Sequence, residues 1–284
     1  MAEKTDDSFG SLPEGFKDKR QSCHNLDVLT GGRLKREIVG QPGCMGLRIK
    51  LGFIYFEIYA SEQEPKISVF NHPRLICWQP LTKLERPTGW WPDLFYSPSQ
   101  YGVVLLKDEN YWQDWSNHAK RHRKKWRQNN DCEIIETNLE SFTEEYNKTK
   151  TKKVGKFLKA AFINGLKLQT KKHPEDVFLY AARRKEDKKI IAGLAVIIYP
   201  DVFQSSHTIS FINPSALKTS VGTGLIDHWY RESLKRGARF LNFGLIWKKG
   251  DPSGWKGYSK FKRQFNPCLL YYRRQFIKFV RASK

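Results

Sequence analysis

The chain of 284 residues has no long hydrophobic run and no apolar segment near its start. Nothing approaches the roughly 20 consecutive apolar residues of a membrane-spanning helix. Residues 1–15 are polar and acidic, so they lack the apolar core of a secretion signal. These absences lead us to expect a cytoplasmic protein without a membrane span.

Paired cysteines are also missing. The five cysteines stand singly, with an odd total and no Cys-x-x-Cys pair: Cys23, Cys44, Cys77, Cys132 and Cys268. This spacing argues against a disulfide framework or a structural zinc site and suits a reducing compartment. Among the seven histidines, His118 and His122 are four apart, but tryptophans flank this pair. We therefore predict no metal site.

Acidic residues are scarce in only one part of the chain. Residues 1–110 hold 14 Lys and Arg and 14 Asp and Glu, so their formal charges cancel. Residues 111–284 hold 36 Lys and Arg against 15 Asp and Glu, which gives the whole net charge of +21. Such an excess favours anionic partners: nucleic acid, a phosphorylated cofactor or an anionic membrane surface. A basic surface that serves only solubility has the same composition.

The hydrophobic pattern divides the chain into three parts. Residues 1–20 are polar and without periodicity, which predicts a flexible tail. Residues 21–110 form a β-rich N-terminal region, because segments such as 52–59 and 103–106 carry strand formers. Residues 111–284, in which helical and strand periods follow one another, form the second domain.

The second domain opens with a basic helix predicted over residues 112–126. One face of this helix is apolar and follows a +3, +4 spacing: Trp112, Trp115, Ala119, His122 and Trp126. The other face is basic and includes Arg121, Lys124 and Lys125. Two interpretations stay open: a helix that binds a polyanion, or a core helix whose outer face is merely solvated.

The rest of the second domain predicts helices and strands in a mixed order. Helices are expected around 141–152, 156–171 and 225–236, and strands over 177–182, 190–198, 206–212 and 239–246. The strand over 190–198 is apolar throughout, as a strand covered on both faces would be. The natural arrangement is a mixed sheet with helices packed on it.

A Gly-x-Gly loop precedes the helix predicted over 225–236. Glycines two apart let the backbone approach a ligand closely, and free amides at a helix N-terminus attract anions. The candidate cofactor-binding residues are Lys218, Val221, Gly222, Thr223 and Gly224. An ordinary tight turn has the same pattern, so the motif is weak by itself.

The order of these segments resembles acyltransferases of the GNAT type. In that family this loop binds the pyrophosphate of coenzyme A and reads Arg or Gln, two variable residues, then Gly-x-Gly or Gly-x-Ala. Here Thr219 occupies the first position, which is a departure. The resemblance implies an α+β fold, a mixed β-sheet flanked by helices, and N-acyl transfer from acyl-coenzyme A.

Residues 111–284 are most similar to the Fem-type aminoacyltransferases. Asn242-Phe243-Gly244 stands where that family often has Asp-Phe-Gly at a strand end. Segment 257–265 resembles the part in which a Phe-Lys pair precedes an aromatic residue, and 116–130 resembles the basic helix before the sheet. Because Fem-type enzymes join two GNAT-like domains, the smaller β-rich N-terminal region would be a degenerate GNAT-like half.

This resemblance implies transfer of an amino acid from aminoacyl-tRNA to the amine of a peptidoglycan precursor peptide at the inner face of the membrane. Phe261 and Lys262 match the pair expected near the tRNA acceptor end and the reacting carbonyl. A fixed cation there would stabilise the oxyanion of acyl transfer. Asp227 and His228 are candidates for proton transfer by position only, the alternatives being a helix-dipole partner and a packed histidine.

Three functions therefore remain open. The first is a Fem-type transferase with tRNA and an amine acceptor as partners and with peripheral contact to an anionic membrane. The second is a coenzyme A-dependent GNAT N-acyltransferase. The third is a non-catalytic nucleic-acid-binding protein. No resident cofactor is assigned, because aminoacyl-tRNA or acyl-coenzyme A would be the donor substrate. The candidate nucleic-acid-binding residues are Arg121, Lys124, Lys125, Lys260 and Arg263.

Overall fold

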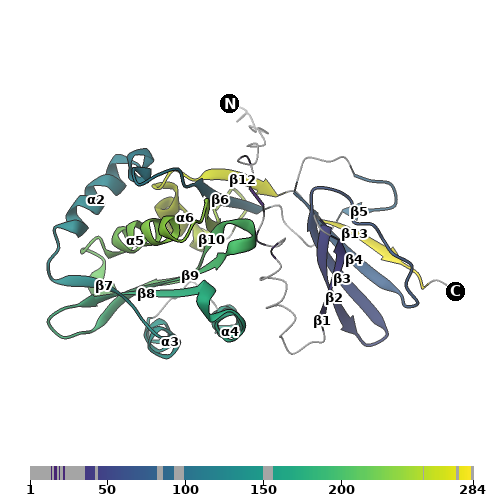
Figure 1. The fold of residues 1–284 in the computed structure, drawn as a ribbon, viewed down its shortest axis with the longest axis horizontal. Helices are drawn as coiled ribbons and strands as arrows, with labels where there is room; N and C mark the ends of the chain where they lie inside the picture. Colours follow the sequence, from purple (N-terminus) through teal and green to yellow (C-terminus); the bar gives the residue numbers. More distant parts are fainter. Residues whose placement is uncertain are drawn as a thin grey trace. The chain divides into compact units, whose positions relative to one another are not determined.

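The computed structural model describes residues 14, 16–17, 19, 22, 36–41, 44–81, 86–92, 99–149, 156–251, 253–272 and 275–282. The chain forms two compact units (Figure 1): unit 1 comprises 1–101 and 268–284, and unit 2 comprises 102–267. The predicted boundary at 110/111 therefore lies inside unit 2, and the last residues of the chain belong to unit 1. Most of the tail predicted over 1–20 lies outside the described residues.

Unit 1 is built on a six-stranded sheet. Its order is β1 (Arg36–Gln41), β2 (Cys44–Leu51), β3 (Ile54–Ser61), β4 (Arg74–Pro80), β13 (Phe276–Val280) and β5 (Trp91–Pro92). A turn at Gly52, where φ is +62°, joins β2 to β3, so the strand predicted over 52–59 begins two residues late. β13 pairs antiparallel with β4, placing Phe276 opposite Trp78 in the core. The C-terminal strand thus completes the N-terminal sheet, which no local sequence signal predicts.

Unit 2 contains most of a seven-stranded sheet. Its order is β12 (Cys268–Tyr272), β6 (Ser99–Leu105), β11 (Phe240–Leu245), β10 (Gln204–Ile212), β9 (Ile190–Tyr199), β8 (Val177–Arg184) and β7 (Cys132–Glu136). Helices α2 (Asn117–Arg127) and α5 (Val221–Lys235) cover one face, and α3 (Leu139–Lys148) and α4 (Lys156–Lys172) cover the other (Figure 1). The mixed α+β architecture is as predicted.

Neighbouring residues of β9 alternate between two cores. Leu194 and Val196 pack with the α2 and α5 side chains, whereas Ala195 packs with those of α3 and α4. A strand covered on both faces has to be apolar at every position, which explains its unbroken hydrophobic run. The described cysteines of the chain are free thiols; Cys132 of β7 is buried, whereas Cys268 of β12 is exposed.

The predicted helix over 112–126 is divided in two. A 3-10 turn over Tyr111–Asp114 ends at Trp115, whose backbone is extended. α2 then begins after Ser116, whose hydroxyl accepts a hydrogen bond from the Ala119 amide at 3.2 Å and caps the helix. Trp115 still packs on the same core as α2, so the apolar spacing persists through the break.

Candidate functional site

β10 and β11 run side by side only at their beginnings. These parallel strands pair through Gln204 with Phe240, Ser205 with Leu241 and Ser206 with Asn242. β10 stays paired with β9 as far as Ile212, with an irregularity at His207. In this described part of unit 2, the register between the two strands ends at Ser206 and Asn242.

A buried lysine from α6 (Lys256–Arg263) occupies the end of β11. Lys262 is only 4% exposed, and its ammonium donates hydrogen bonds to the Leu245 carbonyl at 2.9 Å and to the Phe243 carbonyl. A cation with so little solvent around it acts in a low effective dielectric, so its field on a nearby developing charge is strong. The residue predicted as catalytic thus presents a fixed positive charge at the end of this strand.

The Asn-Phe-Gly segment shapes the strand end that Lys262 contacts. The Asn242 side-chain oxygen accepts a hydrogen bond from the Gly244 amide at 2.7 Å. Gly244 has φ +70°, in the left-handed region that favours glycine. The resulting turn puts the two carbonyls bound by Lys262 on either side of this glycine.

Tyr258 lies between Lys262 and β10. Its hydroxyl is 2.8 Å from His207 Nε2 and 3.2 Å from the Ser210 hydroxyl, and both residues belong to β10. The Lys262 ammonium lies 4.4 Å from the centre of the Tyr258 ring. Helix α6 therefore connects the two diverging strands, with Tyr258 on β10 and Lys262 on β11.

The predicted Gly-x-Gly loop is the first turn of a helix, because α5 begins at Val221 and not near Leu225. A Cβ on Gly224 would lie 2.4 Å from the Trp126 indole, and one on Gly222 would lie 3.0 Å from Ile212 and 3.4 Å from Phe261. Close packing by Trp126 of α2 and Ile212 of β10 explains the two glycines without a ligand. It also places Phe261 against the start of α5.

The other predicted loop residues divide by exposure. Val221 and Thr223 are buried, whereas Lys218 is exposed and its carbonyl accepts a hydrogen bond from Lys125 at 3.2 Å. Ser220, with φ +63°, lies 2.8 Å from His122 through its hydroxyl. Burial, together with the positive charge of nearby groups, lowers the pKa of His122. α2 therefore lies over the N-terminus of α5 and brings basic residues to it.

Asp227 fixes α2 on α5. This carboxylate is 1% exposed and accepts from Arg123 Nε at 2.6 Å and from the Tyr111 hydroxyl at 3.0 Å. Arg127 is 3.4 Å from its second oxygen. Burial and the negative charge of Asp227 raise the pKa of Tyr111, which keeps the phenol protonated as a donor. The position predicted as a proton-transfer candidate is thus held inside an ion-pair network.

His228 is a packed histidine. Its ring lies 4.6 Å from that of Tyr180 in an edge-to-face arrangement. Burial lowers the pKa of His228 to about 4, with the positive charge of Arg231 adding to the effect. The imidazole is therefore neutral near pH 7, which agrees with the packing alternative.

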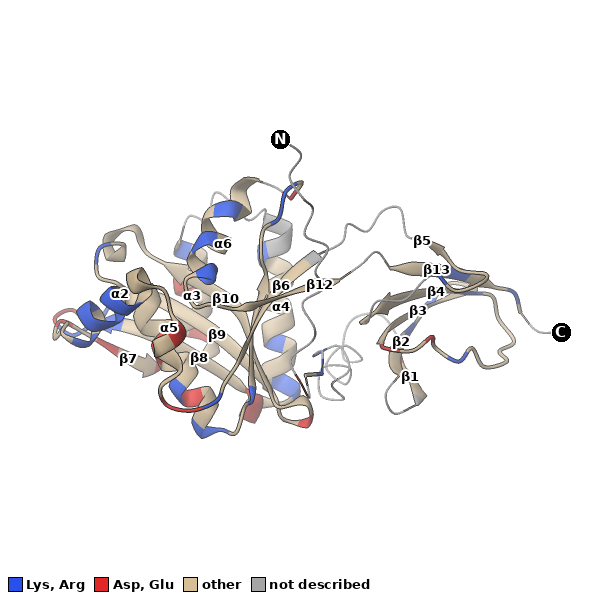
Figure 2. Ribbon diagram, turned by 90° about the horizontal axis from the view of Figure 1, so that it is seen from above, with Lys and Arg blue, Asp and Glu red and all other residues tan. Residues whose placement is uncertain are grey.

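The five predicted nucleic-acid-binding residues all lie exposed on two helices that touch. Arg121, Lys124 and Lys125 are on α2, and Lys260 and Arg263 are on α6. The beginning of α2 meets the end of α6, because the Ser116 amide donates to the Gln264 carbonyl at 2.9 Å. Figure 2 shows the blue Lys and Arg positions along both helices.

Sequence reasoning missed His207 and Tyr258 as parts of this site. They are 51 residues apart and meet only because β10 and β11 diverge. A partial signal was present, since Tyr258 precedes Lys262 by four residues and so shares its helical face. No pattern in the sequence points to His207.

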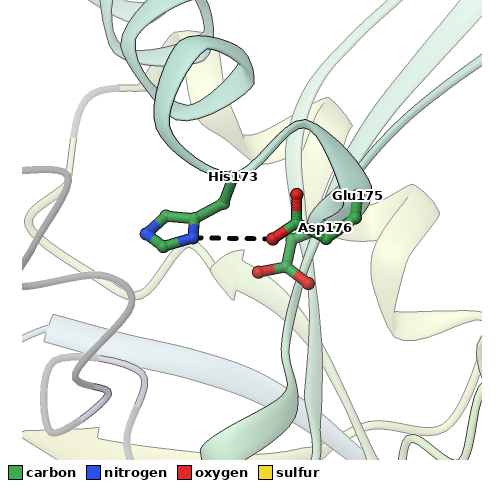
Figure 3. Close-up of side chains that lie close together, drawn as sticks. All are labelled: His173, Glu175 and Asp176. Atoms are coloured by element: carbon green, nitrogen blue, oxygen red, sulfur yellow. Dashed lines mark ion pairs between the residues drawn. The ribbon is translucent and has the colours of Figure 1, made fainter.

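A His-Glu-Asp group follows α4 at some distance in sequence from these residues. Donor atoms of His173, Glu175 and Asp176 lie within 4.8 Å of one another (Figure 3). His173 Nδ1 is 3.7 Å from Glu175, and the Glu175 side chain is 66% exposed. Proximity in the sequence accounts for this grouping, because the three residues lie at the short 3-10 turn Pro174–Asp176 that follows α4.

Comparison with solved structures identifies the architecture. FemX matches with a TM-score of 0.69 at 10% identity, over 96% of this chain and 94% of that one. The chain shares its fold with FemX. L-PGS from Bacillus licheniformis matches with a TM-score of 0.53 at 11% identity, over 89% and 86% of the two chains. No protein-family model and no curated protein sequence matches. The Fem-like, GNAT-like fold predicted from the sequence is thereby confirmed.

None of the helices in the described ranges combines the length and the apolar character that crossing a membrane requires.

Proposed function

We propose that this protein is an acyltransferase that moves an aminoacyl group from aminoacyl-tRNA to an amine, such as that of a peptidoglycan precursor peptide. The observation that carries the proposal is the buried Lys262 ammonium where β10 and β11 diverge, on a fold shared with FemX. Lys262 and Phe261 are also the pair that the resemblance to Fem-type enzymes assigns to the reacting carbonyl and the tRNA end.

The chemistry proposed is direct aminolysis of an ester. The acceptor nitrogen attacks the ester carbonyl, a C–N bond forms, and the bond from that carbon to the ribose oxygen breaks. Negative charge develops on the carbonyl oxygen before the bond breaks, and the Lys262 cation stabilises it. The amine loses a proton and the leaving ribose oxygen gains one. Tyr258 lies beside Lys262 and its hydroxyl is 2.8 Å from His207 Nε2, so these two side chains offer a path for the proton.

The charge of unit 2 supports a polyanionic donor. Arg121 and Lys124 on α2 and Lys260 on α6 are exposed on helices in mutual contact. Phosphate contacts from such residues hold a nucleic acid without reading its sequence. The same excess of positive charge favours peripheral contact with an anionic membrane, which is where a peptidoglycan precursor acceptor would lie.

The first test is transfer by the variant Lys262→Met, followed with labelled aminoacyl-tRNA and precursor peptides. We expect turnover to fall roughly 10²- to 10³-fold, because one charge that stabilises the oxyanion is lost. Lys260→Met is the matched control, since Lys260 is exposed on the same helix. It should weaken RNA binding and leave turnover at saturation unchanged.

Folding of each variant is checked by circular dichroism, because Lys262 is buried. Lys262→Arg keeps the charge and should retain more turnover than Lys262→Met at similar stability. A folded Lys262→Met variant with wild-type turnover would remove this lysine from the mechanism.

A coenzyme A-dependent N-acyltransferase is the second candidate. It is favoured by Lys218 and Lys125, which lie beside the N-terminus of α5, a position that attracts phosphates. The packing of Trp126 against Gly224 and the use of the Thr219 hydroxyl within its own turn weigh against it. Calorimetric titration with acetyl-coenzyme A tests this candidate. Saturable binding would support a coenzyme A-dependent N-acyltransferase, and the absence of any heat of binding would exclude it.

A further inference from the structure

The segment that follows β11 and includes α6 is rich in aromatic and basic residues. Residues 247–263 hold six Lys and Arg and one acidic residue, Asp251. Trp255 is 38% exposed and Tyr258 is 40% exposed. None of the residues from 247 to 260 is Leu, Ile, Val or Met. Rings interleaved with cations, without exposed aliphatic side chains, are typical of surfaces that bind single-stranded nucleic acid.

Hydrogen bonds of Trp247 and Asp251 connect described parts of this segment. The Asp251 carboxylate accepts from the Lys248 amide at 3.0 Å, and its carbonyl accepts from the Trp247 indole at 3.0 Å. The Trp247 amide donates to the Ser259 hydroxyl of α6 at 2.7 Å. Asp251 is thus engaged within the segment, so the exposed charge is cationic. Contacts that are already formed before binding reduce the conformational entropy that is lost on binding.

Trp255, Tyr258 and Lys262 lie on one face of α6. They are spaced by three and four residues, and Trp255 has helical backbone angles just before the helix. The Lys262 ammonium is 4.4 Å from the Tyr258 ring centre. This face therefore leads from the exposed Trp255 ring, past the half-exposed Tyr258 ring, to the buried cation.

We propose that Trp255 and Tyr258 form a stacking platform for the single-stranded 3′ end of an RNA. Bases stack on the two rings, the exposed Lys249, Lys256 and Lys260 contact the phosphates, and the terminal ester points toward Lys262. The inference rests on the proposed function, because only a charged RNA needs its 3′ end beside Lys262. It goes beyond that function by naming which part of the RNA is read and by which side chains.

The test compares two uncharged RNA minihelices that differ only at the 3′ end. One carries a four-nucleotide single-stranded 3′ overhang and the other is blunt, and binding is measured by fluorescence anisotropy of the labelled RNA. Wild-type protein should prefer the overhang. Trp255→Ala should weaken overhang binding about tenfold and leave blunt binding nearly unchanged, because stacking on one aromatic ring is lost. Trp255→Phe should restore most of the affinity.

Two controls separate stacking from charge and from general damage. Trp91→Ala in unit 1 removes a tryptophan that is 69% exposed and should leave both affinities unchanged. The slope of the logarithm of RNA affinity against the logarithm of salt concentration reports the number of phosphate contacts. Lys256→Gln should reduce this slope by about one contact, whereas Trp255→Ala should leave the slope unchanged. Vesicles of phosphatidylglycerol and phosphatidylcholine test a membrane as the occupant instead.

The outcomes distinguish this inference from the proposed function. Equal binding of blunt and overhang RNA by wild type, or an unaffected Trp255→Ala variant, overturns the platform while leaving aminoacyl transfer to be measured separately. Loss of vesicle binding in Trp255→Ala without loss of RNA binding overturns it in favour of a membrane. Overhang-specific binding without aminoacyl transfer supports the platform and contradicts the proposed enzyme.

Discussion

Each of the two units has a buried carboxylate that is paired with arginines and a tyrosine, but the partners come from different kinds of element. In unit 1, Glu57 accepts from Arg48 at 2.7 Å, Arg74 at 3.2 Å and Tyr59 at 3.0 Å, and these residues come from neighbouring strands β2, β3 and β4. In unit 2, Asp227 of α5 binds Arg123 and Arg127 of α2. The first network fixes strands of one sheet, whereas the second fixes a separate helix.

The difference shows how similar chemistry serves two purposes. Glu57 is fully buried and its network connects strands that backbone hydrogen bonds already align. Asp227 holds α2, which has no backbone ladder to the rest of unit 2 and carries the exposed Arg121 and Lys124. Loss of the first network should therefore affect stability alone, and loss of the second should affect stability and RNA binding together.

The largest effect should come from breaking these networks one at a time. Asp227→Asn removes the counter-charge of the buried Arg123, and Glu57→Gln removes that of the buried Arg74. Each should therefore cost about 3–5 kcal/mol in the free energy of unfolding. Urea unfolding measures this cost. Under conditions where both variants are folded, Asp227→Asn should also bind RNA more weakly than Glu57→Gln. Equal RNA affinities would show that α2 does not depend on Asp227 for its position.

A smaller effect should come from the contact between α2 and α5. A Cβ at Gly224 would overlap the Trp126 indole, so Gly224→Ala should destabilise by about 1–3 kcal/mol. Gly165 in α4 is the matched control, because a Cβ there meets nothing within 4 Å. Gly165→Ala should stabilise by up to about 1 kcal/mol through its higher helix propensity. A destabilisation of similar size at both sites would contradict the packing explanation.

The smallest effect should be a pH dependence of the free energy of unfolding that arises from His228 in unit 2. Burial lowers the pKa of His228 to about 4, below the ordinary histidine value of 6.5. The unfolded chain therefore binds a proton at a higher pH than the folded chain does. The stability contribution of neutral His228 is complete above pH 6.5 and is lost as pH falls toward 4.

His228→Gln should reduce the loss of folding stability between pH 6.5 and pH 4. The reduction should be roughly 1 kcal/mol in the free energy of unfolding, after allowance for solvent screening. Thermal melts of both proteins at pH 7, 6, 5 and 4 measure the difference. An equal loss of stability at acidic pH in wild type and variant would show that other groups cause it.

Features encoded by local periodicity were predictable from the sequence. The unbroken apolar run of β9 indicated a strand with two covered faces, and the structure has one. The Phe261-Lys262 pair came from motif order, and the structure puts Lys262 at the strand end. Whether it acts there stays a prediction.

Other features depend on contacts between distant residues, which single-sequence patterns do not encode. The start of α5 was placed too late, because Gly222 and Gly224 have low helix propensity, whereas tertiary packing of β10 and α2 against them favours small residues there. His207 and Tyr258 come together through the divergence of two strands, and Glu57 is a polar residue buried within a strand. Each of these outcomes is decided by tertiary packing after the local preferences are set.

The position of β13 has a consequence for the order in which the protein is made. Residues 276–280, which pair with β4, leave the ribosome after the whole of unit 2, whose last residue is Pro267. Unit 2 can therefore be complete while unit 1, although begun first, still exposes the edge of β4. An exposed strand edge can pair with other chains. A nascent chain that stalls just before β13 would therefore be most prone to aggregate through β4 of unit 1, which was synthesised before unit 2.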